Sequence, residues 1–282
     1  MSRRIDLHTH STASDGTTPP AELVRQAREA GLDVIALTDH DTTAGWAAAA
    51  DALPAGLTLV RGAEISCSWD GISLHLLAYL FDPAEPVFAA RRLALRDSRV
   101  GRAEGMVRKL EADGHDVSWA QVQALAGGTV GRPHVAQALI AAGLVDSVSA
   151  AFTPDWIGTH GRYWVGKMEL DALEAVRLVV GAGGVPVFAH PGASKRGRTV
   201  GEDVVEAMAE AGLAGLEVDH VDHDEPTRRR LNDLARRLDL FVTGSSDFHG
   251  TNKTVQLGAH TTSEASYEQV VSRAAGVEVL SA

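Results

Sequence analysis

Cysteine is nearly absent from this chain. Cys67 is the single cysteine among 282 residues, so no disulfide can form within the chain, and a zinc site built from several thiolates is excluded. Long apolar runs are absent as well: no stretch approaches the about 18 consecutive apolar residues of a transmembrane helix, and the first residues lack the apolar core of a secretion signal. We therefore expect a soluble protein of the cytoplasm with no membrane partner.

Basic residues are too few for a protein that binds nucleic acid through bulk charge. The chain has 26 Lys and Arg against 37 Asp and Glu, a formal net charge of −11. This balance argues against binding duplex DNA, although it leaves a local basic pocket open. The charged fraction of 22% and the apolar fraction of 45% are ordinary for a globular protein and exclude wholesale disorder.

Short segments rich in Val, Ile and Leu alternate with longer helical stretches, which is typical of βα units around a parallel sheet. We expect strands at Ile5–His10, Val34–His40, Leu57–Ser66, Leu74–Leu80, Val185–His190, Gly215–His220 and Leu240–Ser246. We expect helices at Pro19–Ala30 (with Thr18 as its N-cap), Thr42–Leu53, Asp171–Val180, Glu202–Ala211 and Glu225–Leu238. Seven parallel strands favour an α/β barrel over an open sheet, with the strand C-termini on one face.

A segment of about a hundred residues without a strand pattern separates the fourth and fifth strands. It contains helical stretches at Pro86–Ala112, Trp119–Ala126, Pro133–Ala142 and Ser147–Ile157. A structureless loop of that length would be unusual, so we expect residues 82–163 to form a helical insertion in a barrel of residues 1–81 and 164–282. The first of these helices carries a basic set that is either a solvated face or a basic wall over the site: Arg91, Arg92, Arg96, Arg99, Arg102, Arg108 and Lys109.

Histidine is the residue in excess, with 12 in the chain. Six histidines and three carboxylates lie at or just past the expected strand ends: His8, His10, Asp15, His40, Glu64, His75, His190, Asp247 and His249. Residues i and i+2 of a strand share a face, so His8 and His10 project together. Nine nitrogen and oxygen ligands on one rim predict metal rather than a polar core network. They are too many for one ion and suit two or three ions.

The same residues resemble the PHP (polymerase and histidinol phosphatase) family. The motifs that carry the resemblance are His8-Thr9-His10-Ser11, Asp15-Gly16, Thr38-Asp39-His40-Asp41, Gly62-Ala63-Glu64, His75, Ala189-His190-Pro191 and Ser246-Asp247-Phe248-His249. The resemblance implies a distorted (β/α)7 barrel of the TIM-like type with a trinuclear metal centre. It also implies how the ligands divide: one ion held by His8, His10, Glu64 and Asp247, a second by Glu64, His75 and His190, and a third by Asp15, His40 and His249.

Within this family, the insertion with Gly131-Arg132-Pro133-His134 resembles the subgroup that dephosphorylates nucleoside 3′,5′-bisphosphates and trims 5′-phosphorylated RNA. Imidazole and carboxylate ligands without thiolate favour Mn²⁺, Zn²⁺ or Fe²⁺, and we take manganese as the first choice. A hydroxide bridging two of the ions would attack phosphorus. Short single-stranded RNA or a small phosphorylated nucleotide is the expected partner.

Further candidates are assigned by role. We expect Glu64, Asp247 and His223 to act in catalysis. Arg132, at the start of a helix whose first residue would be Pro133, is a candidate phosphate ligand. His134 either binds phosphate or fills a helix interface, Lys195 lies in a basic loop at Pro191–Arg198, and His223 either binds phosphate or supports another residue.

Two other functions fit the same ligands. One is a phosphatase of the histidinol-phosphate type, with the same metals and an amino-alcohol phosphate as substrate. The other is metal-dependent hydrolysis of C–N bonds, as in amidohydrolases, which would have no need for Arg132.

Overall fold

The protein folds around one mixed sheet that nearly closes into a barrel. The computed structural model describes residues 3–282, so the first two residues of the expected barrel segment lie outside the described part. The neighbouring strands run in the order β1 (Ile5–Thr9), β2 (Val34–Leu37), β3 (Thr58–Trp69), β4 (Ile72–Tyr79), β6 (Val185–Phe188), β7 (Gly215–Asp219) and β8 (Phe241–Gly244). A parallel bridge between Thr9 of β1 and Phe248, in the segment that follows β8, nearly closes the sheet. The expected α/β barrel is therefore confirmed.

The expectation that all seven strands are parallel is wrong at β4. This strand runs antiparallel to both β3 and β6, because a tight turn at Asp70 and Gly71, with φ of +46° and +71°, joins β3 directly to β4. The short gap between the two expected strands could have indicated this, since a parallel crossover needs a dozen or more residues. Two short strands that the sequence did not indicate, β5 (Leu170–Asp171) and β9 (Leu280–Ser281), pair with β3.

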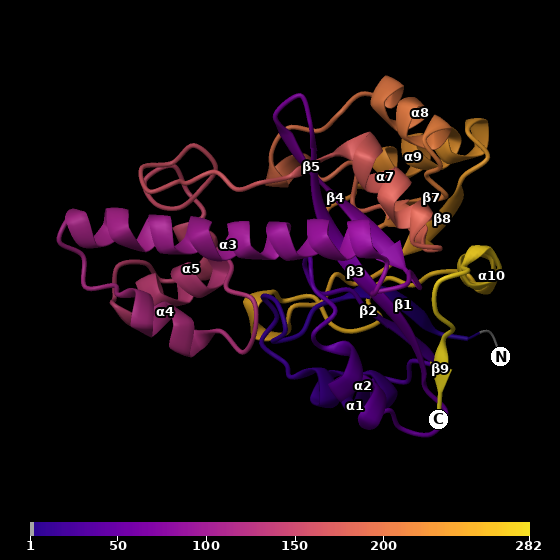
Figure 1. The fold of residues 1–282 in the computed structure, drawn as a ribbon, viewed down its shortest axis with the longest axis horizontal. Helices are drawn as coiled ribbons and strands as arrows, with labels where there is room; N and C mark the ends of the chain where they lie inside the picture. Colours follow the sequence, from indigo (N-terminus) through magenta and orange to yellow (C-terminus); the bar gives the residue numbers. More distant parts are fainter. Residues whose placement is uncertain (1–2) are drawn as a thin grey trace.

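Helices cover the outer surface of the sheet (Figure 1). They are α1 (Pro20–Glu29), α2 (Trp46–Asp51), α7 (Ala172–Gly181), α8 (Glu202–Glu210), α9 (Glu225–Arg237) and α10 (Glu264–Arg273). All but α10 were expected from the sequence. Thr18 is not the cap of α1, because Pro19 occupies that position and makes no side-chain capping bond. Of the helices within residues 3–282, none has the length and apolar character needed to cross a bilayer.

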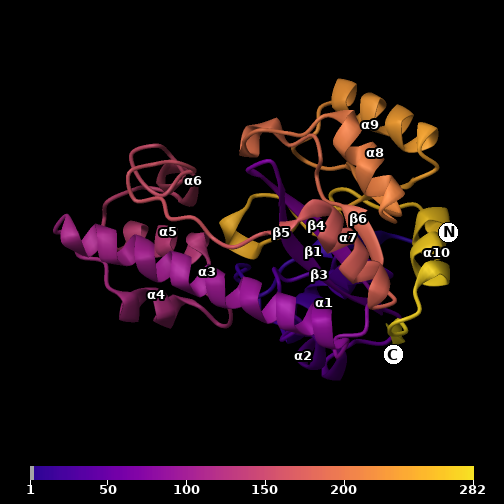
Figure 2. The same cartoon turned by 45° about the horizontal axis from the view of Figure 1, so that its top comes forward.

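Residues 82–163 contribute four helices: α3 (Pro86–Ala112), α4 (Trp119–Leu125), α5 (Arg132–Ala141) and α6 (Val148–Ala151). The last is much shorter than expected. Residues 103–163 have an apolar cluster of their own, centred on Met106, Leu110, Val135 and Leu139. Helix α3 extends from the barrel to this cluster as one long rod (Figures 1 and 2).

An extra residue in β1 determines which side chains face into the barrel. Asp6 is paired with Ile35 and Thr9 with Leu37, so β1 has one residue more than β2 between these positions. A bulge of this kind changes the alternation of side chains along a strand. Ile35 and Leu37 pack in the cluster beneath the helices, and the bulge places Thr9 on that outer side, which directs His8 and His10 inward.

Candidate metal centre

All nine predicted ligands meet at one end of the barrel. His75 reaches this rim for a reason that the sequence did not give: it lies near the start of β4, opposite Ser66, and an antiparallel strand begins where its parallel neighbours end. Glu64 lies inside β3 rather than at its end. His8 and His10 have no exposed surface, and Glu64 and Asp247 are each 1% exposed. Folding thus buries a dense group of imidazoles and carboxylates.

Glu64 lies at the centre of this group and contacts five imidazoles. Its Oε2 atom is 3.2 Å from His8 Nε2, 3.1 Å from His10 Nε2 and 3.2 Å from His40 Nδ1. Its Oε1 atom is 2.7 Å from His75 Nδ1 and 3.0 Å from His190 Nε2. Burial alone would raise the pKa of Glu64, yet the charges of His75, His40 and His8 hold the pKa well below its ordinary value. A carboxylate ionised in this position can bridge cations.

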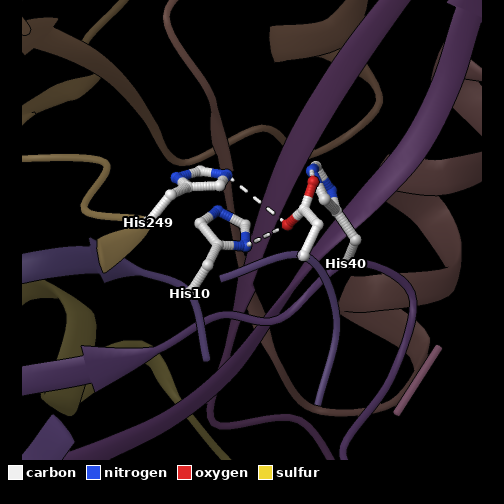
Figure 3. A group of neighbouring side chains, drawn as sticks. His10, His40 and His249 are labelled. Atoms are coloured by element: carbon white, nitrogen blue, oxygen red, sulfur yellow. Dashed lines mark ion pairs between the residues drawn. The ribbon is translucent and has the colours of Figure 1, made fainter. Parts of the chain in front are cut away.

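Asp15 is the centre of a second group, formed by His10, His40 and His249 (Figure 3). Its Oδ1 atom is 3.6 Å from His10 Nδ1 and 3.5 Å from His249 Nε2, and its Oδ2 atom is 3.6 Å from His40 Nε2. Ligand atoms held about 2.1 Å from a common ion lie roughly 3.4 Å apart in a tetrahedron. The spacing around Asp15 is therefore that of ligands around an ion, and it exceeds a hydrogen bond.

Two further observations fit metal at this site. Within the described residues, the Nδ1 atom of His10 is buried with no hydrogen-bond partner. His8 Nε2 and His10 Nε2 are 3.0 Å apart, so two imidazole nitrogens face one another in the interior. A buried polar atom without a partner is costly. A cation bound between these imidazole nitrogens would supply the missing partner.

The backbone is strained where it presents these side chains. Asp41, His190 and Asp247 have φ of +56°, +32° and +53°. Such values cost L-residues free energy and concentrate at functional sites. Each of the three follows a strand, at β2, β6 and β8. We infer that the chain turns sharply there, which directs His190 and Asp247 into the ligand group and Asp41 toward Arg99 and Ser66.

The distances among the rim residues define which of their atoms could share an ion. Among the residues that the structure describes, three sets of atoms lie close enough to share an ion: His10, Asp15, His40 and His249; His8, His10 and Asp247; and His40, Glu64 and His75. His10 and His40 each lie in two sets, and Glu64 also contacts His190. The division of the ligands among ions remains a proposal.

A second feature of the site is a cluster of four buried or partly buried cations, of which the sequence indicated three: Arg132, and Arg99 and Arg102 within the basic set on the first insertion helix. Arg99 and Arg102 of α3 are 5% and 7% exposed, and the Lys167 side chain is 7% exposed. Arg99 binds Asp41 through Nε and donates a 2.7 Å bond to the hydroxyl of Ser66. We call Arg99, Arg102, Arg132 and Lys167 the cation cluster.

The cation cluster carries more positive charge than its neighbours neutralise. Asp41 pairs with Arg99, and Glu169 lies 2.8 Å from Lys167 Nζ, whereas Arg102 and Arg132 form no ion pair within the described part of the chain. Burial and the charge of Arg99 lower the pKa of Arg132 to about 10. Burial, Arg132 and Arg99 lower the pKa of Arg102 well below its ordinary range. Cations crowded together without enough carboxylates are arranged to receive an anion.

The cation cluster adjoins the metal group. The charge of Asp15 acts on both Arg99 and Arg132, and Arg132 is the first residue of α5, one position earlier than expected. The sequence carried a signal for Arg99 and Arg102, but none for Lys167. Arg92, Arg99 and Arg102 share the α3 stripe that buries Phe88, Leu95 and Met106, whereas Arg91, Arg96, Arg108 and Lys109 are exposed. The helix therefore combines a solvated face with a buried basic one.

Three other predicted residues are placed less favourably for direct roles. His223 is 3% exposed, its Nδ1 donates to Val218 O at 2.8 Å, and its Nε2 accepts from Gly192 N at 3.0 Å. Both ring nitrogens are engaged, which favours a supporting role. His134 accepts a 2.9 Å bond from Gly131 N at the start of its own helix. Lys195 is exposed, and the side chain of Arg196, from the same basic loop, lies outside the described part.

Sequence reasoning also missed three residues that hold the ligands. Asp39 accepts bonds from Ser11 and Ser14, between 2.6 and 2.8 Å, and so fixes the loop that carries Asp15. Lys253 Nζ lies 2.6 Å from Asp247 Oδ2. Glu217 accepts from His8 Nδ1 at 2.9 Å. Their signal was weak, since one polar residue on a strand or loop does not reveal its partners.

The chain is similar to known phosphoesterases. The family description that matches is "PHP domain", over residues 6–109. The 3′,5′-nucleoside bisphosphate phosphatase of Chromobacterium violaceum is 34% identical over 91% of each chain. The 5′-3′ exoribonuclease of Haemophilus influenzae is 34% identical over 92% of this chain and 94% of its own. A solved structure of a proposed metal-dependent phosphoesterase from Bifidobacterium adolescentis has a TM-score of 0.92 at 36% identity, covering 98% of both chains.

Proposed function

The chain belongs to the PHP-domain family and is a metal-dependent phosphoester hydrolase; on that premise we propose that it removes phosphate from small phosphorylated nucleotides. The substrate is a nucleoside 3′,5′-bisphosphate or a short 5′-phosphorylated RNA. Names of relatives support both classes, because one relative is a nucleoside bisphosphate phosphatase and another an exoribonuclease.

The observation that carries this proposal is the adjacency of two anion-attracting groups. The imidazole and carboxylate set that includes Asp15 suits divalent ions. The cation cluster, two of whose arginines feel the charge of Asp15, includes Arg102 and Arg132, which form no ion pair among the described residues. A substrate with one scissile phosphate and one phosphate that remains uncleaved would occupy both. A monophosphate would leave the second group unfilled at a cost in binding.

The metal ligands in this proposal are the nine residues of the rim, with Glu64 as the bridging carboxylate. Two or three divalent ions, manganese first, would supply Lewis acidity and a nucleophile at neutral pH. The chain's own residues do the positioning. Asp247 is oriented by Lys253 at 2.6 Å, and Asp39 holds the loop of Asp15. Arg99 is fixed by Asp41 and Ser66, so its guanidinium is in place before substrate arrives.

Residues 82–163 form a substrate-capping insertion in this proposal. Helix α3 supplies Arg99 and Arg102, and α5 supplies Arg132 at its first turn. The N-terminus of α5 adds the positive end of the helix dipole. Both helices thus direct positive charge toward the rim of the barrel. The insertion accordingly selects the phosphoester, and the barrel cleaves it.

The test is an assay of inorganic phosphate release by metal-free protein reconstituted with Mn²⁺. The substrates are a nucleoside 3′,5′-bisphosphate, a 5′-phosphorylated oligoribonucleotide and histidinol phosphate. We expect turnover of the first two, and chelation should abolish it. Turnover of the amino-alcohol phosphate alone would refute the nucleotide proposal in favour of the histidinol-phosphate type.

Arg132→Ala separates ester from C–N hydrolysis. Loss of a buried guanidinium that binds phosphate should lower kcat/KM on the bisphosphate by about 10- to 150-fold, which corresponds to about 1.5–3 kcal/mol for a hydrogen bond to a charged group. Arg229→Ala is the control, because Arg229 is exposed and pairs with Glu225 on its own helix. A loss of less than tenfold for Arg132→Ala would favour the amidohydrolase alternative.

A further inference from the structure

One buried carboxylate outside the ligand set contacts two ligands from different strands. Glu217 of β7 has no exposed surface. Its Oε1 atom accepts from His8 Nδ1 at 2.9 Å and from the hydroxyl of Ser245, and its Oε2 atom accepts from the backbone N–H of His190 at 2.8 Å. Glu217 therefore connects β1 with the segments that directly follow β6 and β8.

The contact with His8 determines which ring nitrogen carries the proton. An ionised carboxylate only accepts, so the bond requires a proton on His8 Nδ1. In the neutral ring, Nε2 then keeps its lone pair. That nitrogen lies 3.2 Å from Glu64 Oε2 and 3.4 Å from Asp247 Oδ1. A carboxylate behind the imidazole thus directs the lone pair into the ligand group, as outer-sphere partners of metal-bound histidines do.

The contact with His190 holds a strained backbone. His190 has φ of +32°, a value that an L-residue keeps only when its surroundings impose it. The bond from its N–H group to Glu217 is one such constraint. In this conformation, His190 Nε2 reaches 3.0 Å from Glu64 Oε1. Glu217 thus acts on His8 through the imidazole ring and on His190 through the backbone N–H group.

We propose that Glu217 is a positioning residue that sets the tautomer of His8 and the backbone of His190 for two adjacent ions. The proposal rests on the metal site proposed above and adds a residue that holds no ion itself. The proposal requires both carboxylate oxygens of Glu217 to accept hydrogen bonds, one from His8 Nδ1 and one from His190 N. An amide in the same place has one acceptor end and one donor end.

Glu217→Gln therefore cannot satisfy both contacts. If the amide NH₂ faces His190, two N–H groups oppose each other. If it faces His8, the ring must accept at Nδ1 and carry its proton on Nε2, the nitrogen directed at Glu64. Either arrangement damages one ligand with almost no change in side-chain volume. We expect the affinity for Mn²⁺ to fall by about 10- to 100-fold, the range for loss of an outer-sphere partner.

The experiment measures binding of metal alone, without substrate. Mn²⁺ affinity and stoichiometry are determined by competition with a chelating dye for wild type, Glu217→Gln and Asp39→Asn. Asp39 is a matched buried carboxylate that bonds Ser11 and Ser14. Its replacement should weaken the ion at Asp15 while sparing those at His8 and His190. Equal affinity of Glu217→Gln and wild type would overturn the proposal, whereas a wild type that binds no ions would refute the proposed function itself.

A second measurement tests the proposal on the wild-type protein itself, and the two variants serve as comparisons. In the wild-type protein loaded with diamagnetic Zn²⁺, the nitrogen spectrum of His8 should show a protonated Nδ1 with a downfield proton, as a bond to a carboxylate requires. In Glu217→Gln, that proton signal should be lost or shifted, while Asp39→Asn should retain it. A wild-type spectrum with the proton on Nε2 of His8 would overturn the proposal even if Glu217→Gln did not fold.

Discussion

Arg102→Met should make the protein more stable and a worse enzyme. Arg102 is 7% exposed, and its Nε atom has no hydrogen-bond partner among the described residues. The neighbouring charges of Arg132 and Arg99 oppose its own. The side chain thus carries a desolvation cost that the protein without substrate does not recover. Methionine keeps the apolar stem and removes the charge.

The two effects can be estimated separately. Replacing buried charged groups by apolar side chains is often stabilising by about 1–4 kcal/mol. For a chain of this size, about 1 kcal/mol raises Tm by roughly 2–4 °C. Loss of a hydrogen bond to a charged phosphate costs about 1.5–3 kcal/mol of binding free energy, which is about 10- to 150-fold in KM. If Arg102 is a buried cation that binds the substrate phosphate, Arg102→Met should show both the gain in stability and the rise in KM.

Arg92→Met is the matched control on the same helix. Arg92 is 6% exposed, donates a 2.6 Å bond to Pro83 O and lies over the rings of Phe81 and Phe88. Its loss should destabilise the fold by about 1–3 kcal/mol and leave the KM unchanged.

The assay combines thermal and urea unfolding of metal-free, phosphate-free protein with steady-state phosphate release. The substrates are a nucleoside 3′,5′-bisphosphate and a monophosphate, and the KM of Arg102→Met should rise for the bisphosphate far more than for the monophosphate. If Arg102→Met loses stability as Arg92→Met does, or treats both substrates like wild type, the reasoning about the cation cluster is refuted.

Other perturbations test the remaining parts of the site. Glu64→Ala should remove the acceptor shared by five imidazoles and lower phosphate release at least about 1,000-fold, the scale of a lost catalytic group; full metal content with a near wild-type rate would contradict its bridging role. Chelation of the ions should lower Tm, since a ligand at 1,000 times its Kd stabilises by about 4.1 kcal/mol, and an unchanged Tm would argue against tightly held ions. Burial lowers the pKa of Lys167 to about 8, and its charged neighbours are Arg99, Arg102, Asp41 and Glu169. Because Lys167 loses its charge as pH rises through that value, the KM for the bisphosphate should increase above about pH 8. The increase should be smaller in Lys167→Arg, whose guanidinium stays charged. Burial raises the pKa of the Cys67 thiol far above its ordinary value, so alkylating reagents should modify Cys67 only on unfolding, and rapid modification of the native protein would contradict that burial.

The sequence alone was sufficient to predict which imidazoles and carboxylates converge at one rim of the barrel. His8 and His10 share a face because strand side chains alternate, and their motifs fall at strand ends that Val, Ile and Leu patterns mark clearly. The long α3 helix was predicted with its observed bounds, Pro86–Ala112. These features are local: each depends on residues a few positions apart in the chain.

The tertiary structure decided the features that depend on distant residues. The sequence did not reveal that β4 returns antiparallel to bring His75 to the rim, nor that an extra residue in β1 changes the alternation of its side chains. In Arg99, a residue typical of a solvated helix face is buried against Asp41, 58 positions away. Periodicity reports which face of an element is apolar, whereas the partner of a buried charge is chosen by packing between elements. The side chains that converge at the rim could therefore be predicted from the sequence, whereas the partners of the buried charges around them could not.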